Sequence, residues 1–183
     1  MIYESQYWKK QLIKSAAKIN RRMTTKRIWT VEQIGGFEQE VMIGFYMIRK
    51  LMDAKKLTNI ICSTKIEGEK YMNNGRTVTL LNNHNPDKLY NLNTPFVQKF
   101  DLKFLINQIV HSYLFYPDFE EMSDGIYALD KLYFTSDDNR NKFLYSIKIS
   151  DIINLFVKVG ECVVLSISYE FNNNKNDYDV KSS

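Results

Sequence analysis

Apolar side chains recur at every third or fourth position in two long stretches near the start of the chain. In residues 5–25 these apolar positions are Trp8, Leu12, Ala16, Ile19 and Met23. In residues 31–56 they are Ile34, Phe37, Val41, Phe45, Ile48 and Met52. This spacing gathers the apolar side chains of each stretch on one face of an α-helix. We therefore expect two long helices, over residues 5–25 and 31–56.

The second of these helices has a recognisable start. Thr30 precedes it and Gln33 follows three positions later, the spacing of a capping box in which each side chain bonds the other residue's backbone N–H. Acidic residues lie early in this stretch and basic residues late, which is the order that the helix dipole favours. Gly35, Gly36 and Gly44 are typical of places where another helix approaches closely. We expect this helix to belong to the core.

The next third of the chain mixes signals for strands and for a helix. A turn at 73–75 precedes residues 76–81, whose alternation and β-branched side chains predict a short strand or hairpin inside a long connection. Residues 99–116 return to helical spacing and are followed by Pro117, which cannot continue a helix. We expect a third long helix over 99–116.

The last third is rich in β-forming residues and turns. Residues 126–134 and 142–149 are separated by a polar turn, which predicts a β-hairpin. Residues 152–159 have the pattern of a short helix. For residues 162–169 the pattern leaves helix and strand open and favours a strand. Residues 172–183 are polar, and we expect a flexible tail there.

These patterns together predict an α+β fold that is predominantly helical. It would have three long helices, a C-terminal helical segment and a small antiparallel β-sheet or hairpin. The length of 183 residues fits a single globular domain, which we place at residues 1–171. A chain with 44% hydrophobic and 25% charged residues is neither a disordered segment, a fibre nor a disulfide-stapled mini-protein.

The two cysteines and the first residues of the chain indicate the cellular compartment. Cys62 and Cys162 have no second Cys or His nearby at metal-ligand spacing. We therefore expect buried thiols in a reducing compartment, rather than a disulfide or a zinc site. The first residues lack the pattern of a signal peptide, and no stretch reaches the roughly 18 apolar residues of a membrane span. A cytoplasmic protein that does not contact a membrane is the expectation.

Positive charge is concentrated at the start of the chain. The formal net charge is +4, but residues 1–31 carry +7 and the remainder carries −3. The candidate binding residues on this segment are Lys10, Lys14, Lys18, Arg21, Arg22, Lys26 and Arg27. One interpretation is a solvated helix face whose lysine stems cover apolar surface. The other is a surface that binds phosphates or an acidic partner, because clustered cations create a strong local field.

Few residues outside 1–31 have the pattern of a catalytic, nucleotide-binding or metal-binding site. The common nucleotide-binding and hydrolase motifs are missing from the sequence. His84 and Asp87 could form half of a metal site, and an exposed loop histidine is the alternative. Asp137 and Asp138 could bind calcium, but the Gly and the Glu of a calcium loop do not follow, so we expect an ordinary turn. We expect no cofactor and no metal.

One short motif does carry candidate chemistry. Residues 106–113 are Ile-Asn-Gln-Ile-Val-His-Ser-Tyr, the pattern x-N-x-x-V-H-x-Y. This resembles the R-N-x-x-V-H-x-Y motif of HEPN domains, helical-bundle proteins of prokaryotic toxin–antitoxin and antiviral systems. Catalytic members of that family cleave RNA without a metal ion. The resemblance implies His111 as general acid or base, Asn107 as a polar orienting group, and Tyr113 as a packing or phosphate-contacting group.

The sequence departs from the family motif at its first position. Ile106 stands where the family has an arginine, and the loss of such a charge-stabilising group costs on the order of 10² or more in rate. Our leading interpretation is a non-catalytic accessory protein in a defence or toxin–antitoxin setting. Its basic first helix would contact nucleic acid, RNA before DNA, or an acidic protein.

Two further interpretations remain open for the motif. The first is a metal-independent ribonuclease in which His111 is the general acid or base. Its cation would come from Arg21, Arg22 or Arg27, or from a second copy in a homodimer. The other is a structural histidine at the flank of a helix that hydrogen-bonds the backbone of a loop.

Overall fold

The computed structural model describes residues 2–23, 29–123, 126–174 and 176–183. Helices hold 41% of these residues and strands hold 32%. The expectation of a predominantly helical chain is therefore wrong, and the fold is a mixed α+β fold. The difference arises because residues expected in a connection, a helix and a tail pair as strands.

The two long helices expected from periodicity are confirmed. The helices are α1 (Ser5–Met23), α2 (Val31–Asp53), α3 (Asn59–Cys62), α4 (Pro86–Leu89), α5 (Leu102–Val110) and α6 (Ile149–Gly160). The capping box of α2 is also confirmed: the Gln33 backbone N–H donates to Thr30 Oγ1 at 3.3 Å, and the Thr30 N–H donates to Gln33 Oε1 at 2.9 Å. The short helix expected at 152–159 begins three residues earlier, with Lys148 as its N-cap.

The described strands form one five-stranded antiparallel sheet and one separate hairpin. They are β1 (Lys65–Met72), β2 (Phe96–Asp101), β3 (Ser112–Ser123), β4 (Ile126–Ser136), β5 (Phe143–Lys148), β6 (Ile167–Asn172) and β7 (Asp177–Ser182). The order in the larger sheet is β2-β1-β5-β4-β3, and β6 and β7 form a separate two-stranded sheet. The hairpin expected between 126 and 149 is confirmed as β4 and β5, which pair antiparallel.

Two elements differ from their predicted form. Residues 76–81 form no strand, and the strand of this region is β1, which precedes the 73–75 turn. The third helix ends at Val110 rather than at 116, because the residues from Ser112 onward pair with β4. Pro117 therefore lies within β3, which is an edge strand and tolerates a residue without an N–H donor.

The chain after α6 also acquires regular structure. The strand favoured for residues 162–169 is present from Ile167 onward, whereas residues 162–166 are irregular. Residues 172–183, expected as a polar tail, contribute β7 and pair along the whole of β6. The Ser182 hydroxyl donates to the Leu57 carbonyl at 2.7 Å and attaches the base of this hairpin to the body.

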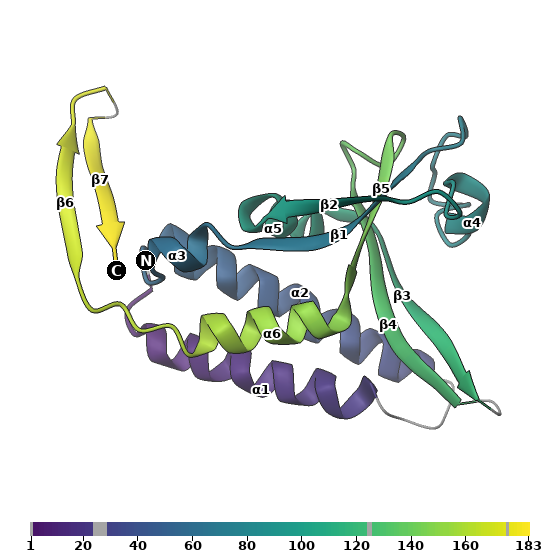
Figure 1. Cartoon of the computed structure of the whole chain (residues 1–183), viewed down its shortest axis with the longest axis horizontal. Helices are drawn as coiled ribbons and strands as arrows, with labels where there is room; N and C mark the ends of the chain where they lie inside the picture. The colour runs from purple at the N-terminus through teal and green to yellow at the C-terminus, as the bar shows by residue number, and fades with distance from the viewer. Residues whose placement is uncertain (1, 24–28, 124–125, 175) are drawn as a thin grey trace.

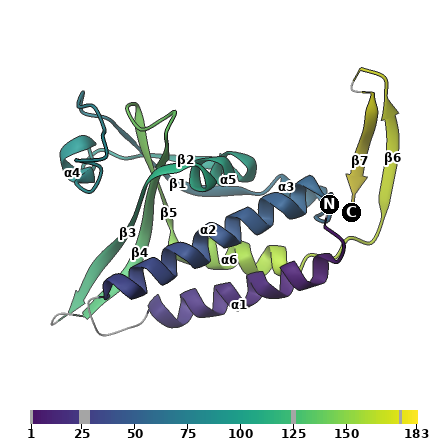
Figure 2. The same cartoon turned by 180° about the vertical axis from the view of Figure 1, so that it is seen from behind.

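The helices and the larger sheet pack on each other as layers (Figure 1). Helices α1, α2 and α6 lie side by side against one face of the twisted sheet, and the β3–β4 hairpin runs down past one end of them. Figure 2 shows the same arrangement from behind, with the β6–β7 hairpin standing away from the body at the end opposite α4. The main core lies between helices and sheet, and residues 73–95 cover part of the other sheet face with a smaller apolar cluster.

Candidate functional site

The basic residues of α1 are divided between its exposed side and its packed sides. Leu12, Ala16 and Ile19 are buried against the rest of the molecule. Lys10, Lys14 and Arg21 are exposed, and their spacing of four and seven residues places them on one side of the helix. We call these three residues the basic stripe. Residues 5–23 contain no Asp or Glu, so no acidic side chain of α1 itself neutralises the stripe.

Lys18 and Arg22, which were also expected to bind a partner, face α2 instead. Lys18 Nζ donates to Glu40 Oε1 at 2.6 Å, and Ser15 Oγ donates to the other oxygen at 2.6 Å. Burial raises the pKa of Glu40, but these hydrogen bonds outweigh it and the net pKa lies below its ordinary value. A Cβ added at Gly36 would lie 3.1 Å from Arg22 Nη1. These two cations therefore help to hold α1 on α2.

Lysines from the end of α2 extend the positive surface. Because α1 and α2 are antiparallel, the end of α2 lies near the start of α1 (Figure 1). Lys55 and Lys56 accordingly line a cavity of about 560 Å³ with Ser5 and Gln6. Lys9, Lys10 and the acidic Glu161 also line this cavity. Burial lowers the pKa of Lys9, whose Nζ donates to the Cys162 carbonyl at 2.7 Å. The expected residues Lys26 and Arg27 lie outside the described residues.

Exposed tyrosines accompany these cations. Tyr7 is exposed and precedes Lys10 and Lys14 by three and seven positions, so it shares their side of α1. On α2, the Lys50 ammonium lies 5.5 Å from the centroid of the exposed Tyr46 ring. Surfaces that combine aromatic rings with cations bind single-stranded nucleic acids. The bases stack on the rings, and the phosphates pair with the cations.

The motif histidine lies at the end of a helix beside an arginine from α2. His111 is the C-cap of α5, and its backbone N–H donates to the Asn107 carbonyl at 3.2 Å. Its Nε2 lies 3.1 Å from Arg49 Nη1. Because a guanidinium can only donate, Nε2 is the acceptor of this hydrogen bond. Arg49, Asn107 and His111 line a cavity of about 340 Å³ together with Asp137 and Asp138.

The other motif positions are separated from this cavity. Ile106 is buried in the main core. Tyr113 lies in β3, where the guanidinium carbon of Arg140 is 4.0 Å from its ring centroid. The structure thus brings Asn107 and His111 together and adds Arg49, which sequence reasoning missed. Arg49 is 62 positions from His111, and no short-range pattern connects the two.

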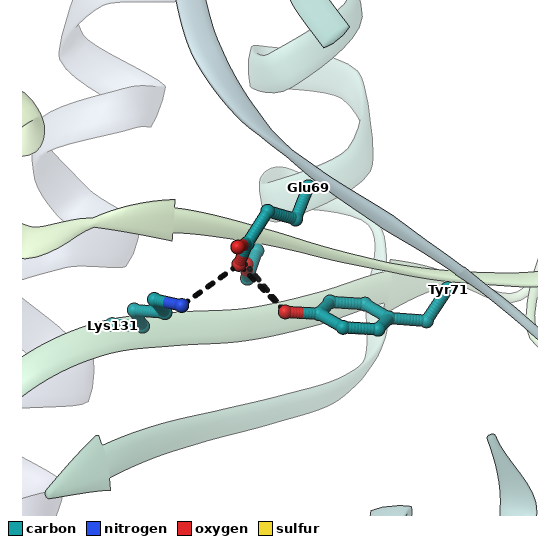
Figure 3. Close-up of polar contacts among 4 residues, drawn as sticks. Glu69, Tyr71 and Lys131 are labelled. Carbon is teal, nitrogen blue, oxygen red and sulfur yellow. Dashed lines mark hydrogen bonds and ion pairs between the residues drawn. The ribbon is translucent and has the colours of Figure 1, made fainter. Parts of the chain in front are cut away.

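A polar network lies on the face of the sheet opposite to α1, α2 and α6, and sequence reasoning did not predict it (Figure 3). Glu69 Oε2 on β1 accepts hydrogen bonds from Tyr71 Oη at 2.6 Å, Lys131 Nζ at 2.9 Å and Ser146 Oγ at 2.9 Å. Burial raises the pKa of Glu69, but these three donors outweigh it and bring the net pKa below its ordinary value. In Tyr71, burial and the Glu69 carboxylate raise the pKa of the phenol.

This network borders a shallow cavity of about 600 Å³. Its lining includes Glu67, Lys148 and Asp151 in addition to Glu69 and Lys131. Burial raises the pKa of Asp151, and the neighbouring Glu67 adds to that rise. The hydrogen bonds of the Glu69 carboxylate to Lys131 and Ser146 join strands β1, β4 and β5 through their side chains.

The remaining candidate positions have ordinary surroundings. His84 and Asp87 are exposed, and Asp137 pairs with Arg140 at 3.1 Å. Among the described residues, no three His, Cys, Asp or Glu side chains gather in a way that could hold a metal ion. Cys62 and Cys162 are free and half-buried.

Comparison of the chain with family models, with curated proteins and with solved structures finds no match. Within the part of the chain that the structure describes, no helix is both long enough and apolar enough to cross a bilayer.

Proposed function

We propose that this protein binds RNA without cleaving it, through the basic stripe of α1. The observation that carries the proposal is the exposure of Lys10, Lys14 and Arg21 on one side of a helix that contains no acidic residue. Lys50, Lys55 and Lys56 extend the positive surface at the start of α1, where all three line a cavity with Trp8. Each phosphate bound by such a cation releases condensed counterions, which drives association at low salt.

Single-stranded RNA is the preferred form of the ligand. The exposed Tyr7 and Tyr46 rings offer flat apolar surfaces beside the lysines. Unpaired bases can stack on such rings, whereas the bases of a duplex are already stacked on each other. An acidic protein partner would use the same charges but would not need the rings.

The test is fluorescence anisotropy with a labelled single-stranded RNA of about 20 nucleotides, titrated at several salt concentrations. The first variant combines Lys10→Gln, Lys14→Gln and Arg21→Gln. The matched control combines Lys88→Gln, Lys99→Gln and Lys142→Gln, which removes the same charge from exposed positions away from α1. The stripe variant should bind at least about tenfold more weakly, and the slope of log K against log salt should fall by about 2. The control should bind like the wild type.

Other outcomes of this experiment reject the proposal. Equal losses in the two variants would show that net charge alone matters. A salt-independent affinity, or no binding at low salt, would remove RNA as the ligand. Replacing Tyr7 by Ala should weaken binding to single-stranded RNA more than to duplex DNA, and the reverse order would contradict base stacking.

A second candidate function is RNA cleavage at His111. The contact between Arg49 Nη1 and His111 Nε2 favours it, because a guanidinium stands beside the histidine although Ile106 replaces the motif arginine. Arg49 could stabilise charge on a phosphate while the imidazole transfers a proton.

This candidate is tested by incubating labelled RNA with the protein in the presence of a metal chelator. Cleavage by the wild type should be lost in His111→Ala and reduced on the order of 10² in Arg49→Ala. His84→Ala is the matched control, because His84 is the second of the two histidines and is exposed in a loop. Intact RNA after incubation with the wild type eliminates the enzyme and leaves the binding proposal standing.

A further inference from the structure

The β6–β7 hairpin has one apolar face and one polar face. Register pairs Tyr169 with Val180 and Phe171 with Tyr178, and side chains of paired residues point to the same side of a hairpin. The apolar hairpin face consists of Ile167, Tyr169, Phe171, Tyr178 and Val180, and at its base it also holds the buried Ser182, which pairs with Ile167. The Tyr178 ring confirms this grouping, since its centroid is 6.3 Å from that of Tyr169 and 5.2 Å from that of Phe171.

The opposite face of the hairpin carries its polar and charged side chains. These are Ser168, Glu170, Asn172, Asp177, Asp179 and Lys181. Asn172 Nδ2 donates to Asp179 at 2.7 Å, and Lys181 lies 3.7 Å from Glu170. This alternation is the pattern of a sheet that is covered on one side and solvated on the other.

The rest of the chain leaves most of the apolar hairpin face uncovered. Relative exposures are 40% for Ile167, 65% for Tyr169, 50% for Phe171 and 55% for Tyr178. The hairpin stands away from the body and is attached at its base, where Ser182 bonds Leu57 (Figure 1). A two-stranded hairpin alone is marginally stable in water, so a covered apolar face is needed to hold it firmly.

We propose that the apolar hairpin face packs against the same face of a second copy of this chain. With roughly 200 Å² for each fully exposed large side chain, the four exposed residues offer roughly 400 Å². A standard stable interface buries about 800 Å² on each partner, so this face supplies about half of that area. Two hairpins stacked about a twofold axis would form a small two-layer sandwich.

Charge on the hairpin favours a second copy over other occupants. The apolar face has no charged side chain, so two copies meet without like charges in contact. The polar face carries Glu170, Asp177 and Asp179 against Lys181 among the described residues, which repels RNA phosphates and anionic lipid surfaces. The dimer does not depend on RNA binding, although it would place two basic stripes in one assembly.

Sedimentation velocity of the whole chain up to about 100 µM tests the dimer. The wild type should change from 21.7 kDa toward twice that mass as its concentration rises. Tyr169→Glu places a charge on the apolar face and should raise the dimer Kd at least about tenfold. Ser168→Glu is the matched control, because it adds the same charge one residue away on the polar face, and its Kd should not change.

A second measurement keeps the test valid if Tyr169→Glu disorders the hairpin. In a chain with Cys62→Ser and Cys162→Ser, a short bis-maleimide should link two Tyr178→Cys copies and should not link two Asp179→Cys copies. A wild type that stays at 21.7 kDa at the highest concentration overturns the proposal. Equal effects of the two glutamates, equal linking of the two cysteines, or growth into open-ended assemblies would also overturn it.

Discussion

Lys131 on β4 donates to Glu69 on β1 at 2.9 Å, across strand β5, which lies between them in the sheet. Ser146 of β5 donates to the same carboxylate oxygen at 2.9 Å. One oxygen atom thus connects three neighbouring strands through their side chains, in addition to the backbone ladder. The ion pair is about three-quarters buried, since the side-chain exposures are 24% for Lys131 and 22% for Glu69. This position predicts a measurable contribution to stability.

Glu69→Gln should lower the free energy of unfolding by about 1–2 kcal/mol at pH 7, because the Lys131 ammonium loses its charged acceptor. Denaturant unfolding measures the difference. Glu67→Gln is the control: it removes the same charge on the same strand from an exposed side chain, and should change stability by less than about 0.5 kcal/mol. Equal effects of the two substitutions would contradict the role given to the network.

The effect of Glu69→Gln should also depend on pH. The folded-state pKa of Glu69 lies below its ordinary value of 4.5, so folding favours the ionised form. The stabilisation is complete above pH 4.5 and is lost as the pH falls through the folded-state pKa. The gap between wild type and variant should therefore shrink on acidification below pH 4.5, and a gap that stays constant would contradict the pKa shift.

Gly44→Ala should be strongly destabilising. A Cβ at this position would lie 2.1 Å from the Phe156 ring, because α2 and α6 approach closely there. We expect a loss of about 2–3 kcal/mol in denaturant unfolding from overpacking. Gly35→Ala on the same helix is the control, since a Cβ there meets nothing within 4 Å and should stabilise by about 0.5–1 kcal/mol. Similar values for the two glycines would refute the close approach.

Ser182→Ala should loosen the β6–β7 hairpin without unfolding the body. It removes the 2.7 Å hydrogen bond to the Leu57 carbonyl, which attaches the base of the hairpin. Amide hydrogen exchange should become about fivefold faster or more in β6 and β7, and should be unchanged in α2. Ser168→Ala, which has an exposed side chain on the polar face, should leave the exchange of both strands as in the wild type. Unchanged exchange in Ser182→Ala would mean that other contacts hold the hairpin.

Cys62 should react slowly with thiol reagents. Burial raises the pKa of this thiol above its ordinary value of 9.0, which lowers the fraction of reactive thiolate at neutral pH. In a Cys162→Ser chain, the rate of alkylation by iodoacetamide should have its midpoint above pH 9.0. A midpoint at or below that value would show that the Cys62 side chain is more solvated than its surroundings indicate.

Local sequence patterns were enough to predict those elements whose secondary structure does not depend on the elements that they pack against. The apolar spacing of α1 and α2 and the Thr30 cap required only residues within one or two turns. The hairpin of β4 and β5 is close in sequence and has a polar turn between its strands. In each of these cases the side-chain period and the terminal signals agree, so the tertiary structure had nothing to override.

Long-range pairing settled the rest. The sequence from Ser112 onward is compatible with either a helix or a strand, and pairing with β4 selects the strand. The polar β7 forms because β6 supplies its hydrogen-bond partners. The contacts Arg49–His111 and Glu69–Lys131 each join residues 62 positions apart. Periodicity reports which side of an element a residue occupies, but only the path of the chain decides which elements meet.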